Sequence, residues 1–341
     1  MPPRGRRAPV TLDDVAALAG VSRTTASRVM SGSPQVRPDT RRSVERAAAK
    51  LGYVPNRAAR SLVTGRTGTV GLVLARSAST VSAPSLLTDL AYHVNRALAG
   101  ADIQLVLFLV EEPEDHERLL RHAASGYIDG ALVFPPCHDD RLVERLREAD
   151  VPFVLGGRSP APDRVQAYVD FDNVHGAMAA VQHLLSCGRR RIGVLAGPED
   201  HPAVVDRLAG YRKALAGAGR VDEELVVRAG GELGSSETAM HELLRRCPDL
   251  DAVLTTTDLL VVGAMRVLRA TGRRVPQDVA VVAFDDGGML ALLEPGLTRV
   301  TQRLDLMARE MVRLLLDQLA GERTARVAVV LEPELVVGRT T

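Results

Sequence analysis

From residue 69 onwards, short apolar runs alternate with amphipathic helical patterns, and this alternation constrains the fold more than any other feature of the sequence. Runs such as TVGLVLA (69–75) and IQLVLFLV (103–110) contain few polar residues, so strands built from them must be covered on both faces. Each run is followed by a segment long enough for a helix. Continuous apolar strands alternating with helices are typical of α/β folds with parallel sheets and helices on both faces.

The alternation occurs in two sets, which predicts two doubly wound lobes. The second set starts near YVDFDN (168–173). A helix over 304–319 and the closing segment VAVVLEPELVVG (327–338) complete both lobes, so the chain crosses between them more than once. We expect the first lobe to comprise residues 68–169 with 303–322, and the second to comprise 170–302 with 323–341.

The first 54 residues follow a different pattern, that of three short helices. Thr11 and Asp14 form a capping-box-like start to the first helix, and Gly20 ends it. Ser22 is a good N-cap for a second helix, and a third helix is expected over 38–51. The apolar residues of all three fall on faces that pack together, which predicts a helix-turn-helix.

Charge separates this head from the rest of the chain. Residues 1–66 contain 13 Arg and Lys against 4 Asp and Glu, whereas the remainder contains 30 against 38. A basic head on an acidic body is typical of a DNA-binding protein. A generic helical bundle or dimerisation element is the alternative, but the pattern, the turn and the charge together favour DNA binding, with the start of the second helix in the major groove.

Two segments carry a resemblance to a known family. VTLDDVAALAGVSRTTASRVMSG (10–32) and VRPDTRRSVERAAAKLGYVPNRAARSLVTGRT (36–67) resemble the head of the LacI/GalR family of bacterial transcription regulators. The resemblance is nearly gap-free over about 66 residues and continues more loosely to the C-terminus. It implies a DNA-binding domain over 1–54, a hinge helix and linker over 55–67, and a two-lobed, periplasmic-binding-protein-like body.

The resemblance also implies roles in the head. Arg23 and Thr24 would read base edges, and Arg28 would reach a base or a phosphate. Leu62 would insert as a wedge into the DNA minor groove, although a plain linker whose leucine packs on the body is the alternative. The other expected DNA contacts are Thr11, Ser22, Thr25, Ser27, Asn56, Arg57 and Ala59.

Ligands of such bodies bind beyond the carboxyl ends of the strands, here between the lobes. The resemblance implies that Arg207 and Asp285 hold ligand hydroxyls and that Gln302 lies at a lobe crossover; a surface salt bridge or a capping role is the alternative. Gly157 stands where the family often has an aspartate, and only 3% of the residues are aromatic. The candidate ligand-binding residues are Arg158, Arg207, Thr257, Asp258, Phe284, Asp285 and Gln302.

The sequence therefore predicts a transcription regulator, expected to be a repressor, whose affinity for a pseudo-palindromic operator in double-stranded DNA is controlled by a small effector. A carbohydrate-like effector is expected, but Gly157 and the small number of aromatic residues argue against a simple hexose. A pentose, a disaccharide, a nucleoside, a sugar phosphate or no tightly bound effector is left open. Two DNA half-sites require at least a homodimer. We expect a cytoplasmic, nucleoid-associated protein with no membrane segment, no metal and no cofactor.

Two other functions fit the body less well. A solute-binding protein of the transport type shares the two lobes, but the DNA-type head and the lack of an apolar leader argue against it. A nucleotide-dependent enzyme would need a phosphate-binding loop, and neither G-x-G-x-x-G after the first strand nor G-x-x-x-x-G-K-[ST] is present. We therefore expect no enzymatic activity.

Overall fold

The computed structural model describes residues 10–31, 33, 35–54, 65–75, 84–111, 113–135, 141–159, 167–230, 233–284, 290, 295–322 and 327–341. The chain divides into two compact units, a head over residues 1–68 and a body over residues 69–341. In the part of the chain that is described, no helix is long and apolar enough to span a membrane.

The head contains three helices, α1 (Leu12–Ala19), α2 (Arg23–Met30) and α3 (Pro38–Leu51). The expected capping box is confirmed, because Asp14 N donates to Thr11 Oγ1 (3.3 Å) and Thr11 N donates to Asp14 Oδ2 (2.8 Å). Gly20 ends α1 with a φ of 67°, a conformation that favours glycine. The fully or nearly buried core consists of Val15, Ala16, Ala26, Val29, Val44, Ala47 and Ala48.

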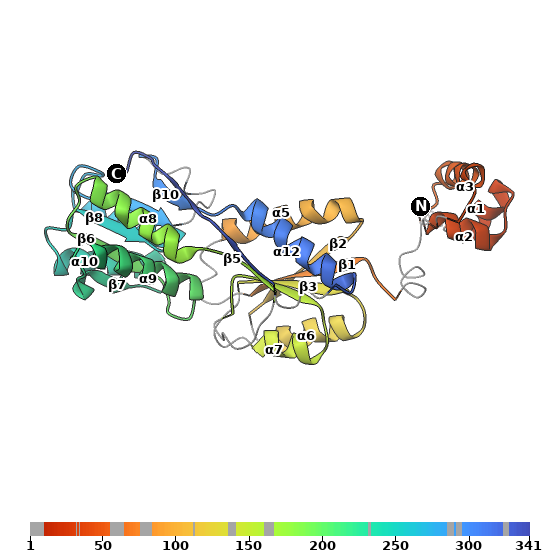
Figure 1. Cartoon of the computed structure of the whole chain (residues 1–341), viewed down its shortest axis with the longest axis horizontal. Helices are drawn as coiled ribbons and strands as arrows, with labels where there is room; N and C mark the ends of the chain where they lie inside the picture. The colour runs from red at the N-terminus through yellow and green to blue at the C-terminus, as the bar shows by residue number, and fades with distance from the viewer. Residues whose placement is uncertain are drawn as a thin grey trace, which may run out of the picture. The chain divides into compact units, whose positions relative to one another are not determined.

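The first lobe of the body is a six-stranded parallel sheet of order β11-β5-β4-β3-β1-β2. Helices α5 and α12 cover one face and α6 and α7 the other, as Figure 1 shows. The strands are β1 (Thr69–Ala75), β2 (Gln104–Val110), β3 (Gly130–Phe134), β4 (Phe153–Gly156), β5 (Tyr168–Phe171) and β11 (Ala328–Leu331). The helices are α5 (Pro84–Leu98), α6 (Pro113–Ala124), α7 (Arg141–Glu148) and α12 (Leu304–Leu319).

The second lobe repeats this plan with the order β12-β10-β9-β8-β6-β7, in which the β10–β12 pair is antiparallel and the others are parallel. Helices α8 and α9 pack on one face, and α10 and α11 on the other. The strands are β6 (Ile192–Ala196), β7 (Val226–Arg228), β8 (Ala252–Thr255), β9 (Ala280–Phe284), β10 (Thr298–Thr301) and β12 (Glu334–Val336). The helices are α8 (Asn173–Ser186), α9 (Pro202–Gly217), α10 (Leu233–Arg246) and α11 (Asp258–Ala270).

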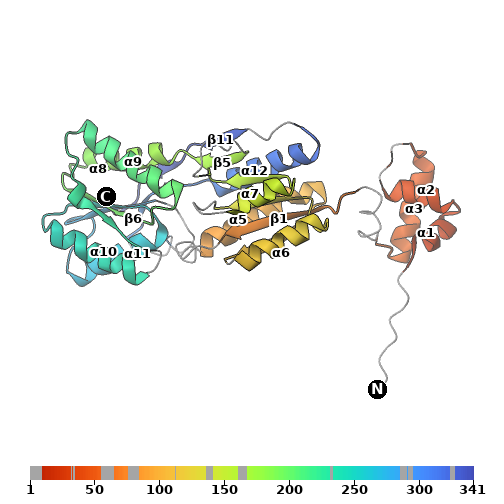
Figure 2. The same cartoon turned by 90° about the horizontal axis from the view of Figure 1, so that it is seen from below.

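The expected lobe boundaries are wrong in two places. Strand β5 lies wholly in the first sheet, so the first lobe runs to residue 171 and YVDFDN ends that lobe instead of opening the second. Strand β11 pairs with β5, so residues 328–331 also belong to the first lobe, and Figure 2 shows the two strands together. Short apolar strands look alike in sequence, and long-range pairing decides which sheet each one joins.

Within the described residues, the chain passes between the lobes from β5 to α8, from β10 to α12 and from β11 to β12. The backbone N–H of Asp172 donates to the carbonyl oxygen of Leu331 (2.9 Å), which ties the first of these crossovers to the third. The paired crossovers bring the start of α8 to the carboxyl edge of the first sheet. That edge is where a ligand cleft is expected.

Helices α8 and α9 approach each other closely at Gly210. A Cβ atom at this position would lie 2.3 Å from the carbonyl oxygen of Val174 and 2.9 Å from the Cβ of Ala177, both on α8. The first of these neighbours is backbone, so the contact can be relieved only by moving a helix. Glycine is therefore required at this position if α9 is to keep its place on α8.

We expect Gly210→Ala to lower the free energy of unfolding of the body by about 1–3 kcal/mol, the usual cost of overpacking. Gly217→Ala is the matched control, because it lies on the same helix and a Cβ there meets nothing within 4 Å. The control is expected to leave stability unchanged or to raise it by up to about 1 kcal/mol. Urea unfolding monitored by circular dichroism measures both, and equal effects at the two positions would contradict the packing argument.

Candidate DNA-reading face and effector cleft

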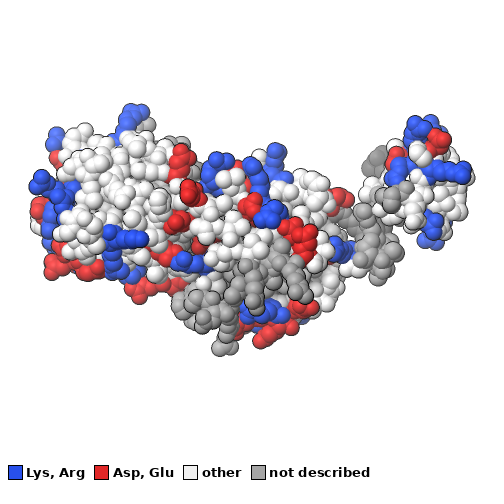
Figure 3. Space-filling view, in the orientation of Figure 1, with Lys and Arg blue, Asp and Glu red and all other residues white. Residues whose placement is uncertain are grey.

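The start of α2 presents several of the predicted DNA-contacting side chains to solvent. Arg23, Thr24, Ser27 and Arg28 are exposed, and Thr25 is half-buried. Because residues 23, 24, 27 and 28 are spaced by about one helical turn, they occupy one side of the helix. Figure 3 shows Lys and Arg prevailing over Asp and Glu on the visible face of the head. This arrangement suits insertion of α2 into a groove lined by phosphates.

Ser22 makes two contacts with Thr25 at the N-terminus of α2. Its hydroxyl oxygen accepts a hydrogen bond from Thr25 N (3.1 Å), which caps α2, and it lies 2.9 Å from Thr25 Oγ1. A capped N-terminus keeps the remaining first-turn N–H groups oriented outwards, where they favour an anion such as a phosphate.

Arg23 has an acidic neighbour within the head. Its Nε lies 3.5 Å from Asp13 Oδ1, and the two side chains are 72% and 62% exposed. An ion pair this exposed contributes little to stability, so Arg23 can exchange this contact for a base edge at small cost. The predicted hinge residues Asn56, Arg57, Ala59 and Leu62 lie outside the described residues.

The body contains a cavity lined from both lobes. Of the predicted ligand-binding residues, Arg158, Arg207, Thr257, Asp258 and Gln302 line it, and Asp285 lies outside the described residues. The other polar groups at its wall include Asp170, Asn173 and His201, and its apolar walls include Phe134, Phe171, Leu86, Leu304 and Met307.

Arg207 lies on the cavity wall but is almost completely buried, with 4% of its surface exposed. Its Nε donates to Asn173 Oδ1 (2.9 Å) and its Nη1 to the carbonyl oxygen of Thr256 (2.6 Å). The guanidinium carbon lies 3.9 Å from the centroid of the Phe284 ring, so the cation stacks on that ring. These contacts fix the guanidinium in one orientation at the cavity wall.

Phe284 was also predicted to bind the ligand, and its ring is the one on which Arg207 stacks. Its side chain is fully buried and is not among the described residues that line the cavity. The ring supports the guanidinium of Arg207. Two aromatic side chains, those of Phe134 and Phe171, line the cavity although only 3% of the residues are aromatic.

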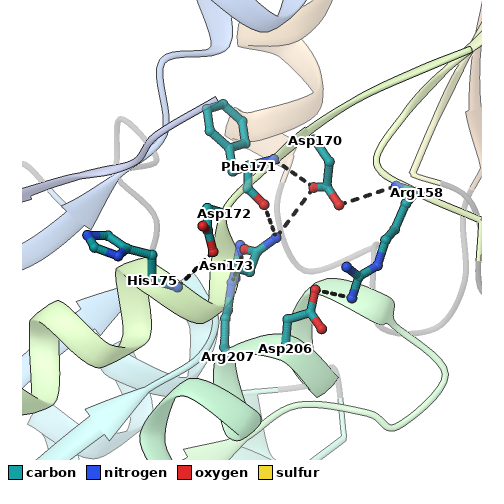
Figure 4. Close-up of polar contacts among 8 residues, drawn as sticks. All are labelled: Arg158, Asp170, Phe171, Asp172, Asn173, His175, Asp206 and Arg207. Atoms are coloured by element: carbon teal, nitrogen blue, oxygen red, sulfur yellow. Dashed lines mark hydrogen bonds and ion pairs between the residues drawn. The ribbon is translucent and has the colours of Figure 1, made fainter. Parts of the chain in front are cut away.

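Asp170 and Asn173 form the link between Arg207 and the first lobe (Figure 4). Asn173 Nδ2 donates to the carbonyl oxygen of Phe171 (3.1 Å) and more weakly to Asp170 Oδ1 (3.4 Å). Burial raises the pKa of Asp170, while hydrogen bonds from the backbone N–H groups of Phe171 and Arg158 act in the opposite direction. The carboxylate thus holds the β5–α8 crossover and the loop after β4 together.

Arg158 extends from that loop across the cleft. Its backbone N–H donates to Asp170 Oδ2 (3.4 Å), and its guanidinium Nη2 forms an ion pair with the Asp206 carboxylate on α9 of the second lobe. Two carboxylates distant in sequence therefore contact Arg158, Asp170 at its backbone N–H and Asp206 at its guanidinium.

His201 immediately precedes α9 and lines the cavity. Burial lowers its pKa, the carboxylate of Asp200 opposes this shift, and the charge of Arg207 adds to it. The imidazole is therefore neutral near pH 7, with one nitrogen that donates and one that accepts a hydrogen bond. A neutral group of this kind suits hydroxyl groups better than a charged ligand.

The sequence reasoning missed Asp170, Asn173, His201 and Asp206. The first two lie in YVDFDN, which carried a signal, namely a carboxylate and an amide directly after an apolar strand. That signal was masked because the segment was placed at the start of the second lobe. Asp206 precedes Arg207 in sequence, but its partner Arg158 lies 48 residues away and only the folded chain reveals it.

Two family models match the chain. Residues 11–56 match the bacterial regulatory proteins of the lacI family, and residues 181–341 match a periplasmic binding protein-like domain. The first match covers the three helices of the head, and the second falls within the body.

Relatives match over nearly the whole length. The HTH-type transcriptional regulator CelR of Thermobifida fusca is 48% identical over 334 residues, covering 97% of this chain and 98% of the relative. The HTH-type transcriptional regulator AglR of Rhizobium meliloti is 33% identical over 296 residues, covering 84% of this chain and 80% of the relative.

Two solved structures are similar over the full chain. A complex of the transcriptional regulator CelR with cellobiose gives a TM-score of 0.76 at 46% identity, covering 97% of this chain and 100% of that one. The Lac repressor dimer bound to its operator and the anti-inducer ONPF gives a TM-score of 0.82 at 27% identity, covering 98% and 99%. The head, the two-lobed body and these full-length likenesses agree, and the chain therefore belongs to the LacI family of bacterial regulatory proteins and is a DNA-binding transcriptional regulator.

Proposed function

We propose that this regulator is a repressor that binds a pseudo-palindromic operator as a homodimer and responds to cellobiose or a closely related disaccharide. The main observation behind the effector proposal is that the chain is 48% identical to CelR over 97% of its length, and that a CelR structure has been solved with cellobiose. The groups that line the cleft also suit a sugar. The protein binds its ligand without converting it, and it acts in the cytoplasm, where the DNA is.

The chemistry of the cleft favours a neutral ligand rich in hydroxyl groups. Among the described lining residues, two arginines and two aspartates balance one another, so a sugar phosphate would bring uncompensated charge. The guanidinium of Arg207 and the amide of Gln302 are groups that recognise hydroxyls. Phe134 and Phe171 offer apolar surface to sugar-ring faces, which carry C–H groups.

The head supplies the DNA specificity. We propose that Arg23 and Thr24 read base edges in the major groove and that Arg28 reaches a base or a phosphate. Thr11, Ser22, Thr25 and Ser27 would position the head on the backbone, and Asn56, Arg57, Ala59 and Leu62 would act in the hinge. Two heads on one pseudo-palindrome require two copies of the chain, and the similar Lac repressor was solved as a dimer on its operator.

Effector and DNA are linked through the conformation of the body. If cellobiose binds the closed arrangement of the lobes better than the open one, it shifts the population of body conformations. Because the linkage is reciprocal, cellobiose changes the affinity for the operator by the same factor by which the operator changes the affinity for cellobiose. The first experiment is selection of binding sites from a random duplex pool, in the presence and absence of cellobiose. A palindromic motif enriched in one condition supports the proposal, and the same motif at the same affinity in both conditions contradicts the effector.

Arg23→Ala is expected to relax base preference at one position of each half-site and to cost about 1–3 kcal/mol there, because a bidentate Arg–guanine contact is lost. Arg42→Ala is the control, since it removes an exposed arginine of α3 that pairs with Asp39. It should weaken binding to all sequences slightly and equally. Fluorescence anisotropy on the selected operator and its single-base variants measures both. An equal loss on every sequence in Arg23→Ala would refute the base-reading role.

Arg207→Lys is expected to weaken cellobiose binding by about 10- to 100-fold, the size of a lost hydrogen bond to a charged group, while operator binding without sugar persists. A lysine keeps the charge, but its single ammonium group cannot contact Asn173, Thr256 and the cavity at once, as the planar guanidinium can. Lys213→Ala is the control, because Lys213 is an exposed residue of the same helix. Isothermal titration calorimetry with cellobiose distinguishes the two, and an unchanged affinity in Arg207→Lys would remove Arg207 from the site.

A further inference from the structure

An ion pair joins Arg158 of the first lobe, which lines the cavity, to Asp206 of the second lobe. We propose that Arg158 and Asp206 form a latch that holds the body closed, and that Asp206 is a positioning residue through which closure is coupled to effector binding. The latch is a property of the body itself, but its effect on cellobiose affinity rests on the proposed function.

The two partners belong to different lobes. Arg158 follows β4 in the first lobe, whereas Asp206 lies in the second turn of α9 in the second lobe. Figure 4 shows the two side chains reaching toward each other from these elements. The Asp206 side chain is 13% exposed and that of Arg158 is 44% exposed, so the pair is partly shielded from solvent. Shielding makes it stronger than an ordinary surface pair.

The ion pair closes a ring of contacts around the crossover. Arg207 binds Asn173, Asn173 binds Asp170, and Asp170 accepts from the backbone N–H of Arg158. Asp206 and Arg207 are adjacent on α9, so the ring returns to its starting helix. Most of these contacts join residues at the β5–α8 crossover or within the second lobe. Rotation of one lobe against the other changes the distances between such residues little. The Arg158–Asp206 contact reaches across the cleft, so opening of the lobes breaks it first.

The latch is connected to the cavity on one side only. Arg158 lines the cavity, whereas Asp206 is not among the described residues that do. A change at Asp206 can therefore alter ligand affinity without removing a ligand contact. If the closed state binds cellobiose, loss of the latch lowers the closed population, and the apparent affinity falls by the same fraction.

The lobe arrangement can be measured without any ligand. In full-length protein carrying Cys137→Ser, spin labels on Ser125→Cys in the first lobe and on the natural Cys187 in the second report the lobe–lobe distance. Both positions are exposed, and Cys247 is buried. Dilution with unlabelled protein isolates distances within one protomer. Asp206→Asn and Arg158→Gln should each broaden or shift the electron–electron distance distribution, and the double variant should resemble either single variant. An unchanged distribution, or additive effects, would overturn the latch.

Cellobiose titration provides the second readout. Asp206→Asn is expected to raise the dissociation constant roughly fivefold or more, within the usual range of coupling between sites, and Asp206→Glu should restore most of the affinity. Glu199→Gln is the matched control, because Glu199 pairs with Arg228 (2.7 Å) within the second lobe and should change neither readout. Unaltered cellobiose affinity in Asp206→Asn would overturn the coupling. If wild-type protein does not bind cellobiose, the proposed effector fails, while the ligand-free distances still decide whether the latch exists.

Discussion

The buried guanidinium of Arg207 is the interaction on which the geometry of the cleft depends. A charge with 4% of its residue surface exposed is tolerated only when hydrogen bonds replace the lost water. Asn173 and the carbonyl oxygen of Thr256 supply these bonds from α8 and from the end of β8, and the Phe284 ring supplies a face for the cation. Because each partner comes from a different element, Arg207 fixes the relative positions of α8, α9 and the carboxyl edge of the second sheet.

That arrangement requires α9 to lie close to α8. The missing side chain at Gly210 permits this approach, since a Cβ there would overlap the backbone of α8. Helix α9 then carries Asp206 toward the first lobe and Arg207 toward the cavity wall. Packing of two helices in one lobe thus sets both the charge at the cavity wall and the contact between lobes.

Much of the head could be predicted from sequence, because its determinants are local. Thr11, Gly20 and Ser22 act within three or four residues of their partners, and the apolar spacing of three short helices specifies a small core. The alternation of strands and helices in the body could also be predicted from the sequence. The lobe boundaries could not be predicted, because β5 and β11 are short apolar strands, and long-range pairing determines which sheet each one joins. The stacking of Arg207 on Phe284 was not predicted for a related reason, since the contact between two side chains distant in sequence leaves no local pattern.

The sequence by itself determined the class of the molecule: a basic helix-turn-helix head and a body of two doubly wound lobes. These features follow from spacing, capping and charge, which act over a few residues. Only the tertiary structure decided which polar groups meet. Arg158 and Asp206 lie 48 positions apart, and Arg207 and Thr256 lie 49 apart, so their contacts depend on how sheets pair and helices pack. A cleft between lobes is made of such non-local contacts, because its walls come together only when the whole body has folded.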